Sequence, residues 1–334
     1  MSVSASPAST QPYVDAGVPD GARTLLRLGE AIELYLGYQR RRGRRPATLR
    51  SASVMLRAFL RWAGSEVPVS QITRASVELV FFADWHAAFE ARHGGPPSTS
   101  TSRCLLGAIK GLFQFLDAFD LLCSPDGTAV RNPLAHLDIP PAAPPRRNAL
   151  RPEAAAALIA AARTPNERII VNLLRWTGMR AGEAAALTAA DIDLDRSEIH
   201  IRASKTDRGI RTLPLLDPLH DPLQEWLTYR NRCGLFPGSG PLLATERGTA
   251  TCPRNLWRVV RRVSERARIF TPDSSYVTPQ ALRRTFATDL LNRGVRLEVV
   301  SRLLGHASTA ITEHAYATLS DERVREEVAA ALRQ

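Results

Sequence analysis

The residues that could act together on a phosphate group are concentrated between residues 278 and 316 of this 334-residue chain. Arg283 lies inside an apolar helical pattern, His306 follows the sequence Leu-Leu-Gly, and Tyr316 follows a short helical segment that begins near Ser308. A guanidinium, an imidazole and a phenol could bind, hydrogen-bond and attack one phosphate. The alternative interpretation is that all three are ordinary surface and core residues of a helical protein.

Further residues with suitable chemistry lie upstream. Arg180 stands at the start of a predicted helix, just after Gly178, and Glu183 lies one turn along, where its carboxylate could hold the guanidinium. Helix N-termini and arginines both attract phosphate. The basic residues of the chain are almost all arginines, and the two lysines are Lys110 and Lys205. A lysine that remains in so arginine-rich a chain is a candidate for a specific role.

Local signals predict the helices that carry these side chains. Thr278 and Pro279 are a typical N-cap and first helical residue, and Gly178 and Gly305 are typical of helix ends. The apolar positions of the three predicted helices repeat at helical spacing: Ile169, Ile170, Leu173 and Leu174 in the first, Leu282, Phe286, Leu290 and Leu291 in the second, and Val299, Val300, Leu303 and Leu304 in the third.

A β-hairpin is predicted to carry Lys205 in its loop. Ile199 and Ile201 alternate with polar residues in the first strand, and a partner strand runs through Leu213. Pro214, which cannot donate a backbone hydrogen bond, suits the edge of such a small sheet. This part of the chain is therefore expected to combine helices with a small sheet.

The composition of the chain divides it into four segments. Residues 1–25 are rich in Ser, Ala and Pro and are expected to be a flexible tail. Residues 26–137 are expected to form a helical domain, and residues 138–149, with the sequence DIPPAAPPRRNA, a semi-rigid linker. Residues 150–334 are expected to form the domain that carries the chemistry.

Four helices are predicted in the first domain. Leu34 and Tyr38 mark the apolar side of the first helix, which ends in a basic run. The fourth helix buries a stripe that consists of Leu105, Ile109, Leu112, Phe113 and Leu116. Four helices with short connections predict a compact bundle.

Basic side chains in this domain and in the linker are candidate phosphate contacts. They are Arg40, Arg41, Arg42, Arg44 and Arg45 after the first helix, Lys110 on the fourth helix, and Arg146 and Arg147 in the linker. Such contacts give affinity for nucleic acid without reading its sequence. The alternative is a solvated charge run without a partner.

The overall charge favours an anionic partner. The formal net charge is +11 and the isoelectric point is near 10.3, which indicates nucleic acid first. The four cysteines are far apart and lack the paired spacing of a metal site, so reduced thiols in a cytoplasmic protein are expected. No segment is apolar for long enough to span a bilayer, and no membrane association is expected.

Five motifs then occur in a fixed order: TGMRAGE, SKTDRGIRTLPL, ALRRTFAT, LLGH and a tyrosine. As a set they resemble the tyrosine recombinase, or phage integrase, family, from about residue 27 to the C-terminus, and its two-domain Xer-like members in particular. The resemblance implies a mainly α fold with a small antiparallel β-sheet. An N-terminal four-helix, SAM-like core-binding domain would precede a C-terminal α+β catalytic domain.

The resemblance also implies a role for each matching side chain. Tyr316 would attack a DNA phosphodiester and form a 3′-phosphotyrosyl bond. Arg180 and Arg283 would hold the non-bridging oxygens, which carry more negative charge in the transition state. Lys205 would donate a proton to the leaving 5′-oxygen, which an arginine could not readily do. His306 would hydrogen-bond the scissile phosphate.

Two further positions complete the comparison with the family. Glu183 matches the acidic residue that supports the first arginine, although it could also be a plain helix-surface residue. Gln280 departs from the pattern, because family members usually carry His three residues before the second arginine. Its amide can donate a hydrogen bond to phosphate but cannot exchange a proton. We therefore expect an active enzyme that is slower or less sensitive to pH; the alternative is a weakened or inactive DNA-binding protein that retains the fold.

The family resemblance finally predicts partners. These are double-stranded DNA with an inverted-repeat core site and three further copies of the chain, forming a homotetramer on two duplexes with a Holliday junction, without metal, ATP or another cofactor. Residues 320–334 are predicted to form a helix whose apolar stripe docks on a neighbouring copy or on its own domain. A type IB topoisomerase would share the chemistry, but the size and the spacing from LGH to the tyrosine fit a recombinase better.

Overall fold

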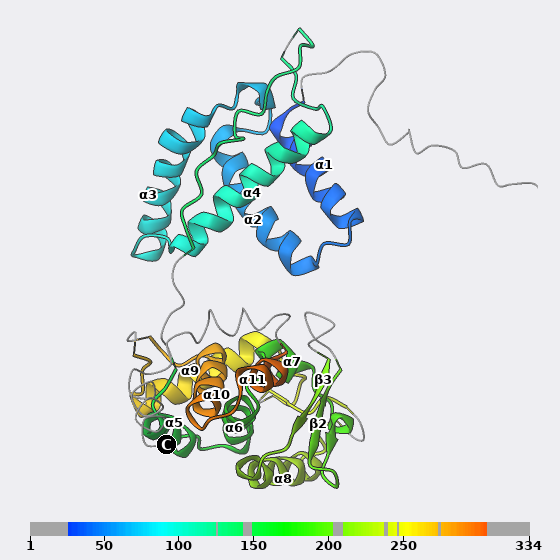
Figure 1. The fold of residues 1–334 in the computed structure, drawn as a ribbon, viewed down its shortest axis with the longest axis vertical. Coiled ribbons are helices and arrows are strands. Elements are labelled where there is room, and N and C mark those ends of the chain that lie inside the picture. Colours follow the sequence, from blue (N-terminus) through cyan, green and yellow to red (C-terminus); the bar gives the residue numbers. More distant parts are fainter. Residues whose placement is uncertain are drawn as a thin grey trace, which may run out of the picture. The chain divides into compact units, whose positions relative to one another are not determined.

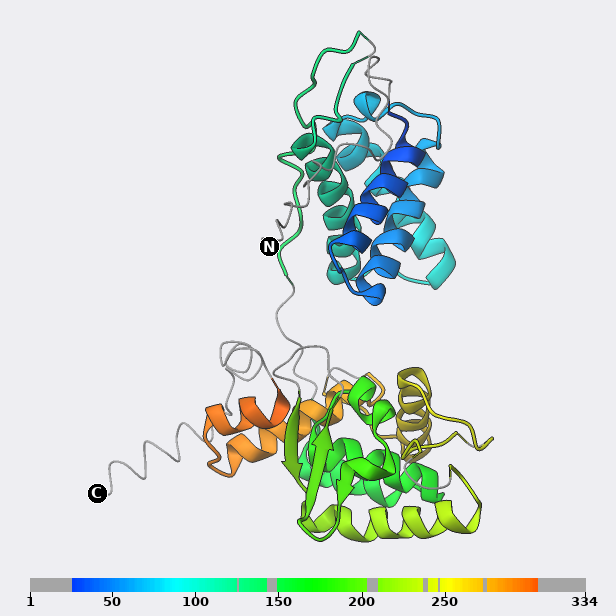
Figure 2. The same cartoon turned by 90° about the vertical axis from the view of Figure 1, so that its right-hand side faces the viewer.

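The structure is a computed structural model that describes residues 26–124, 126–142, 149–202, 210–236, 240–245, 247–272 and 275–305. The chain divides into two compact units, Met1–Pro144 and Pro145–Gln334, each with its own hydrophobic core (Figures 1 and 2). The exact domain boundaries named above stay a prediction. The predicted N-terminal tail, Arg146 and Arg147 of the linker, and the predicted C-terminal helix lie outside the described residues.

The first unit contains the four predicted helical segments. They are α1 (Leu28–Arg41), α2 (Pro46–Ala63), α3 (Phe82–His93), which continues a π-helical segment η2 (Ser76–Phe81), and α4 (Thr99–Ala118); a 3-10 turn, η1 (Val69–Gln71), precedes η2. Helix α4 packs against α1 and α2, and all five residues of its predicted stripe are buried. The short connections bring these helices into one bundle.

The buried face of α1 differs from the prediction. Leu34 is exposed, whereas Leu28, Ala31, Ile32 and Tyr35 are buried. These four residues follow the i, i+3, i+4, i+7 spacing of one helical face, so the face starts at Leu28 and not at Leu34. Tyr38 is half-buried, with its ring centroid 5.0 Å from that of Phe115.

The second unit combines helices with a small sheet, which confirms the predicted fold class. Its helical elements are α5 (Pro152–Ala160), α6 (Pro165–Thr177), α7 (Ala181–Ala186), the 3-10 turn η3 (Ala189–Asp191), α8 (Asp217–Arg232), α9 (Pro253–Ala267), α10 (Pro279–Asn292) and α11 (Leu297–Leu304). Its strands are β1 (Ile192–Asp193), β2 (Glu198–Ile201) and β3 (Arg211–Pro214). They form an antiparallel sheet in the order β1-β2-β3, in which Ile201 pairs with Arg211.

Helix α6 is the centre of the second unit. It packs against α8, α9 and α10 (Figure 1). Its four predicted core residues, Ile169, Ile170, Leu173 and Leu174, are buried. Thr164 caps its start by accepting a hydrogen bond from the Glu167 amide at 3.1 Å. Gly178 ends the helix in the left-handed conformation, with φ of +59°, as predicted. Arg180 therefore follows directly from the best-buried helix of the unit.

Helices α10 and α11 pack on each other beside α6. Thr278 caps α10 by accepting a hydrogen bond from the Ala281 amide at 3.1 Å, with Pro279 in the first turn. Phe286, Leu291, Val300 and Leu304 form a small apolar cluster between α10 and α11. Helix α11 ends at Gly305, which is left-handed as predicted. Among the described helices, none has the length and apolar character that crossing a bilayer would require.

Candidate active site

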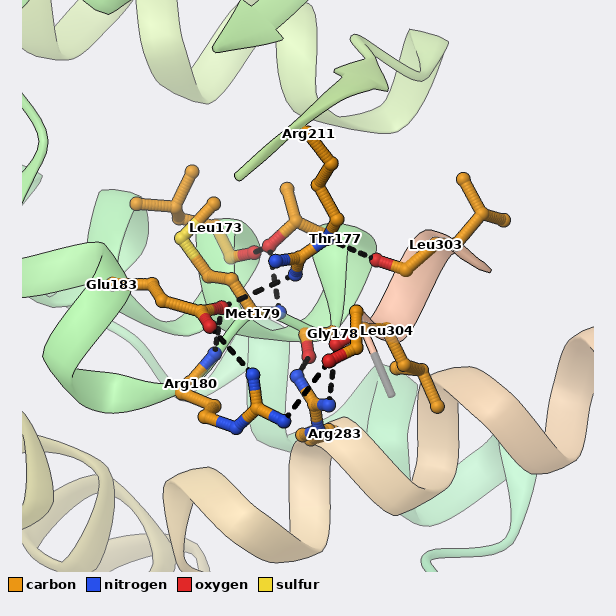
Figure 3. Close-up of polar contacts among 11 residues, drawn as sticks. Leu173, Thr177, Gly178, Met179, Arg180, Glu183, Arg211, Arg283, Leu303 and Leu304 are labelled. Carbon is orange, nitrogen blue, oxygen red and sulfur yellow. Dashed lines mark hydrogen bonds and ion pairs between the residues drawn. The ribbon is translucent and has the colours of Figure 1, made fainter. Parts of the chain in front are cut away.

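Arg180 and Glu183 form the first part of the site, at the start of α7 (Figure 3). One carboxylate oxygen of Glu183, Oε1, accepts from Arg180 Nη1 at 2.7 Å, and the other, Oε2, accepts from the Arg180 backbone N–H at 2.9 Å. The second bond caps the first turn of α7. The Glu183 side chain is 3% exposed and that of Arg180 31% exposed. Glu183 therefore holds a guanidinium that a ligand can still reach.

Arg283 approaches the same place from the first half of α10. It is 2% exposed, and its two terminal nitrogens donate to backbone carbonyls, Nη1 to Gly178 at 2.8 Å and Nη2 to Leu304 at 2.6 Å. Both acceptors lie at the C-terminal ends of helices, α6 and α11. Arg283 thus ties together three segments that are far apart in the sequence.

The last residues of α11 receive hydrogen bonds from three different arginines. Residues 303–305, which we call the α11 C-terminal turn, offer carbonyls without partners inside the helix. The Leu303 carbonyl accepts from Arg211 Nε at 2.5 Å, that of Leu304 from Arg283, and that of Gly305 from Arg180 Nη2 at 3.3 Å. The turn that immediately precedes His306 is thereby fixed by three guanidiniums.

Arg211 is a member of this cluster that sequence reasoning missed. Its Nη2 lies 3.1 Å from Oε2 of Glu183, and its side chain is 6% exposed. The available signal was the strand alternation: Arg211 and the buried Leu213 are two residues apart in β3 and so share the inward face. A charged residue on the buried face of a strand needs a partner, which here is Glu183.

The electrostatics of the cluster follow from burial and from this pairing. Burial alone would raise the pKa of Glu183, but the hydrogen bond from the Arg180 backbone and the charge of Arg211 together hold its pKa below the ordinary value. Burial lowers the pKa of Arg211, and Glu183 opposes that shift. The cluster contains three guanidiniums and one carboxylate, which leaves an excess of positive charge that suits an anion.

Of the other predicted catalytic residues, Gln280 belongs to the part of the chain that the structure describes. Gln280 is exposed in the first turn of α10, one turn before Arg283. Lys205, His306 and Tyr316 lie outside the described residues. The chain enters the segment with Lys205 from β2 and leaves it at β3, and His306 follows Gly305 directly.

The predicted DNA-binding residues of the first unit have two different environments. The arginines at 40, 41, 42, 44 and 45 are all exposed around the end of α1. Arg42 lies over the Tyr38 ring at 5.6 Å, and Arg44 Nε donates to Gln39 at 3.1 Å. Lys110 is half-buried and its ammonium donates to the Leu137 carbonyl at 3.2 Å. DNA contact stays a prediction for all of these residues.

Comparison with known proteins identifies the family. The sequence profile of the phage integrase family matches residues 148–323. Tyrosine recombinase XerA of Pyrococcus furiosus is 30% identical over 166 residues, which cover 48% of this chain and 53% of that protein. Tyrosine recombinase XerA of Thermococcus kodakarensis is 27% identical over 301 residues, covering 89% of this chain and 93% of that protein.

The fold has counterparts among solved structures. The crystal structure of a lambda integrase tetramer bound to a Holliday junction matches with a TM-score of 0.65 and 18% sequence identity. The match covers 85% of this chain and 78% of the lambda integrase chain. At this identity the likeness concerns the fold alone. The family profile, which matches more than half of the chain, shows that this chain belongs to the phage integrase family of tyrosine recombinases, which are DNA strand-transfer enzymes.

Proposed function

We propose that the protein is a site-specific DNA recombinase or integrase that cleaves and rejoins DNA strands through a 3′-phosphotyrosyl intermediate. The observation that carries the proposal is the convergence of Arg180 and Arg283 on the α11 C-terminal turn, directly before His306. Two guanidiniums at one place can bind both non-bridging oxygens of a phosphodiester. They stabilise the pentacoordinate transition state more than the ground state, because more negative charge lies on those oxygens there.

The proposed reaction exchanges one phosphoester bond for another. The Tyr316 phenol oxygen attacks phosphorus, a bond between phosphorus and the tyrosine oxygen forms, and the bond to the 5′-oxygen breaks. The phenol gives its proton to solvent water, and the leaving 5′-oxygen takes a proton from Lys205. Attack by the 5′-hydroxyl of a second strand reverses these steps and releases Tyr316. Since the number of phosphoester bonds is conserved, the chemistry needs no ATP, and the guanidiniums supply charge stabilisation without a metal.

The supporting roles follow from geometry and from chemical type. Glu183 orients Arg180 through the two-oxygen contact described above. His306 would add a hydrogen bond to the phosphate, and Gln280 would add another through its amide. Because the Gln280 side chain cannot exchange a proton, other residues must donate and accept protons in the proposed reaction. The alternative function, a DNA-binding protein with weakened or lost strand exchange, depends on this position.

The proposed partner is double-stranded DNA with an inverted-repeat core site. The net charge of +11 and the exposed arginines at the end of α1 support affinity for a phosphate backbone. A lambda integrase of the same fold has been solved as a tetramer on a Holliday junction, and we extend that arrangement to four copies of this chain. Action on DNA also agrees with a cytoplasmic location.

A nicked suicide substrate tests the proposal. The substrate is built on the site that footprinting of the protein identifies, and the readout is a protein–DNA band that resists SDS. We expect the wild-type chain to form this band, Tyr316→Phe to lose it while still binding DNA, and Tyr229→Phe, which alters a half-buried tyrosine of α8, to retain it. DNA binding without any covalent band would favour the alternative function, and a band in Tyr316→Phe would transfer the nucleophile to another residue.

A further inference from the structure

Arg211 connects three segments that the proposed reaction uses. Its Nε donates to the Leu303 carbonyl of the α11 C-terminal turn at 2.5 Å, and its Nη2 contacts Glu183 Oε2 at 3.1 Å (Figure 3). In the sheet, Arg211 pairs with Ile201. Ile201 ends β2 and Arg211 begins β3, so the two residues flank the segment of the sequence that contains Lys205. A single side chain therefore links the start of α7, the end of α11 and the foot of the hairpin.

The carboxylate of Glu183 is shared between two guanidiniums. Oε1 accepts from Arg180, whereas Oε2 accepts from the Arg180 backbone and from Arg211. Because the Glu183 side chain is 3% exposed, water cannot readily replace a lost partner. Without Arg211, Oε2 of Glu183 would lose the guanidinium that contacts it. The carboxylate would then turn toward the guanidinium of Arg180. The Arg180 guanidinium would then change its direction.

The burial of Arg211 indicates how it acts. Its side chain is 6% exposed, against 31% for Arg180, and its guanidinium is held by Glu183 and by the Leu303 carbonyl. Its Nε and Nη2 face two different acceptors, a fork that a single lysine ammonium cannot reproduce. Both properties are those of a side chain that fixes its neighbours.

We propose that Arg211 is a positioning residue of the strand-transfer site, which holds Glu183 against Arg180 and the α11 C-terminal turn against β3. This role rests on the proposed function. Arg211 influences the reaction through the direction of the Arg180 guanidinium and through the turn before His306, without touching the scissile phosphate. A small displacement of a charge-stabilising group can cost about 100-fold in rate.

The first experiment compares Arg211→Met and Arg211→Lys with the wild-type chain on the nicked substrate. We expect the rate of covalent adduct formation to fall about 10- to 100-fold in both variants, with the affinity for DNA changed by less than about 3-fold, since the side chain is buried. Arg230→Met is the matched control, because Arg230 is also a buried arginine that donates to two carbonyls, those of Phe236 and Gly240, but on α8. It should lose folding stability without slowing adduct formation. Equal rates in wild type and Arg211→Met would overturn the role.

A second experiment separates positioning of Arg180 from a general loss of structure. A methylphosphonate at the scissile position removes the charge of one non-bridging oxygen and so reduces the need for a correctly placed guanidinium. The defect of Arg211→Met should shrink to less than about 3-fold on this substrate. A 5′-bridging phosphorothiolate has a leaving group that needs no proton. Rescue by this substrate alone would mean that Arg211 acts through Lys205, and an undiminished defect on both would mean a structural role; either result would overturn the proposal.

A double variant tests the route through Glu183. If Arg211 acts by holding Glu183, then adding Arg211→Met to Glu183→Gln should slow adduct formation by much less than Arg211→Met does alone. Fully multiplicative effects would contradict this route. The wild-type arm keeps the two proposals apart: no wild-type adduct would reject the proposed function and this role with it, whereas a wild-type adduct with a normal Arg211→Met rate would reject the role alone.

Discussion

Arg283 is 2% exposed, and its guanidinium donates to the carbonyls of Gly178 and Leu304. Removing a charged group from water costs several kcal/mol unless hydrogen bonds and nearby charges or dipoles compensate. Both acceptor carbonyls belong to helix C-termini, which carry the negative end of the helix dipole. The protein therefore offsets the cost of a buried cation with oriented backbone. The same bonds fix the direction of the guanidinium before any ligand arrives.

The first prediction concerns a single side chain, in the variant Gln280→His. Gln280 is exposed one turn before Arg283, so an imidazole there can reach solvent and a bound phosphate. Since an unperturbed histidine titrates near about 6.5, we expect adduct formation to become faster and its pH profile to change between about pH 6 and 7. Gln224→His, on the exposed side of α8, is the control and should change neither. An unchanged rate and profile in Gln280→His would contradict the prediction.

A second prediction for a single residue concerns the variant Gly178→Ala. A Cβ at this position would lie 2.4 Å from Phe286 Cδ1, and φ of +59° is unfavourable for alanine. Overpacking and backbone strain together should lower the free energy of unfolding by about 2–4 kcal/mol, measured in urea. The carbonyl that accepts from Arg283 would also shift, which should slow adduct formation.

Gly182→Ala provides the opposite control for this change. Gly182 lies inside α7, and a Cβ there would meet no described atom within 4 Å. We expect it to raise the free energy of unfolding by about 0.5–1 kcal/mol, because alanine favours the helix. If Gly182→Ala lowered the free energy of unfolding as much as Gly178→Ala does, the close approach of the new Cβ to Phe286 would not be the cause of the loss in Gly178→Ala.

The elements of the second unit are joined by ion pairs as well as by apolar packing. Glu167, in the first turn of α6, is 1% exposed. It accepts from Arg266 of α9 through both oxygens, at 2.8 and 2.9 Å, and from the Arg163 backbone at 2.9 Å. Arg262 lies 3.2 Å from the same carboxylate. These contacts fasten the start of α6, the helix whose other end leads into Arg180.

This pairing predicts a loss of stability in acid. The hydrogen bonds from Arg266 are the largest cause that lowers the pKa of Glu167, from 4.5 to about 2. A lowered pKa in the folded state means that the stabilisation is complete above pH 4.5 and is lost as the pH falls toward 2. The expected contribution is about 3 kcal/mol. Urea unfolding of wild type and Glu167→Gln across this range should show a stability gap that closes at low pH.

Glu225→Gln is the matched control for the acid prediction. Glu225 accepts from Arg168 at 2.8 Å in an exposed pair, with side chains 41% and 47% exposed. Exposed pairs contribute about 0–1 kcal/mol, so this variant should follow the wild-type curve. A gap between wild type and Glu167→Gln that stayed constant down to pH 2 would mean that the carboxylate charge is not what stabilises α6.

At the scale of the whole molecule, the two units have separate hydrophobic cores. Phe113 is fully buried in the core of the first unit, and Leu174 is fully buried in that of the second. The exposed arginines at the end of α1 belong to the first unit, and the arginine cluster belongs to the second. We therefore expect backbone affinity and strand chemistry to be separable properties of one chain.

Substitutions in the cores test this separation. Phe113→Ala should cost the first unit about 3–5 kcal/mol, and Leu174→Ala should cost the second about 2–5 kcal/mol. Calorimetry of the full chain should show that each change lowers the midpoint of a different transition. If either variant lowered all transitions equally, the units would unfold as one cooperative body.

The sequence by itself determined the elements and the family. Thr278, Gly178 and Gly305 act through their own backbone and near neighbours, so the helix ends they mark could be predicted from local chemistry. The order of five motifs indicated the family, and the profile match confirmed it. The local pattern was less decisive where two helical faces compete, as with the exposed Leu34 of α1.

Only the tertiary structure decided which groups meet. Arg211 contacts Glu183 across 28 positions and Leu303 across 92, and Arg283 contacts Gly178 across 105. Residue spacing within a helix or strand predicts neighbours a few positions apart, but it contains no information about acceptors on another element. Those contacts depend on how α6, α10 and α11 pack around one apolar core. They also depend on where the last carbonyls of α11, which have no partner within the helix, then point. The role proposed for Arg211 therefore became visible only in the folded chain.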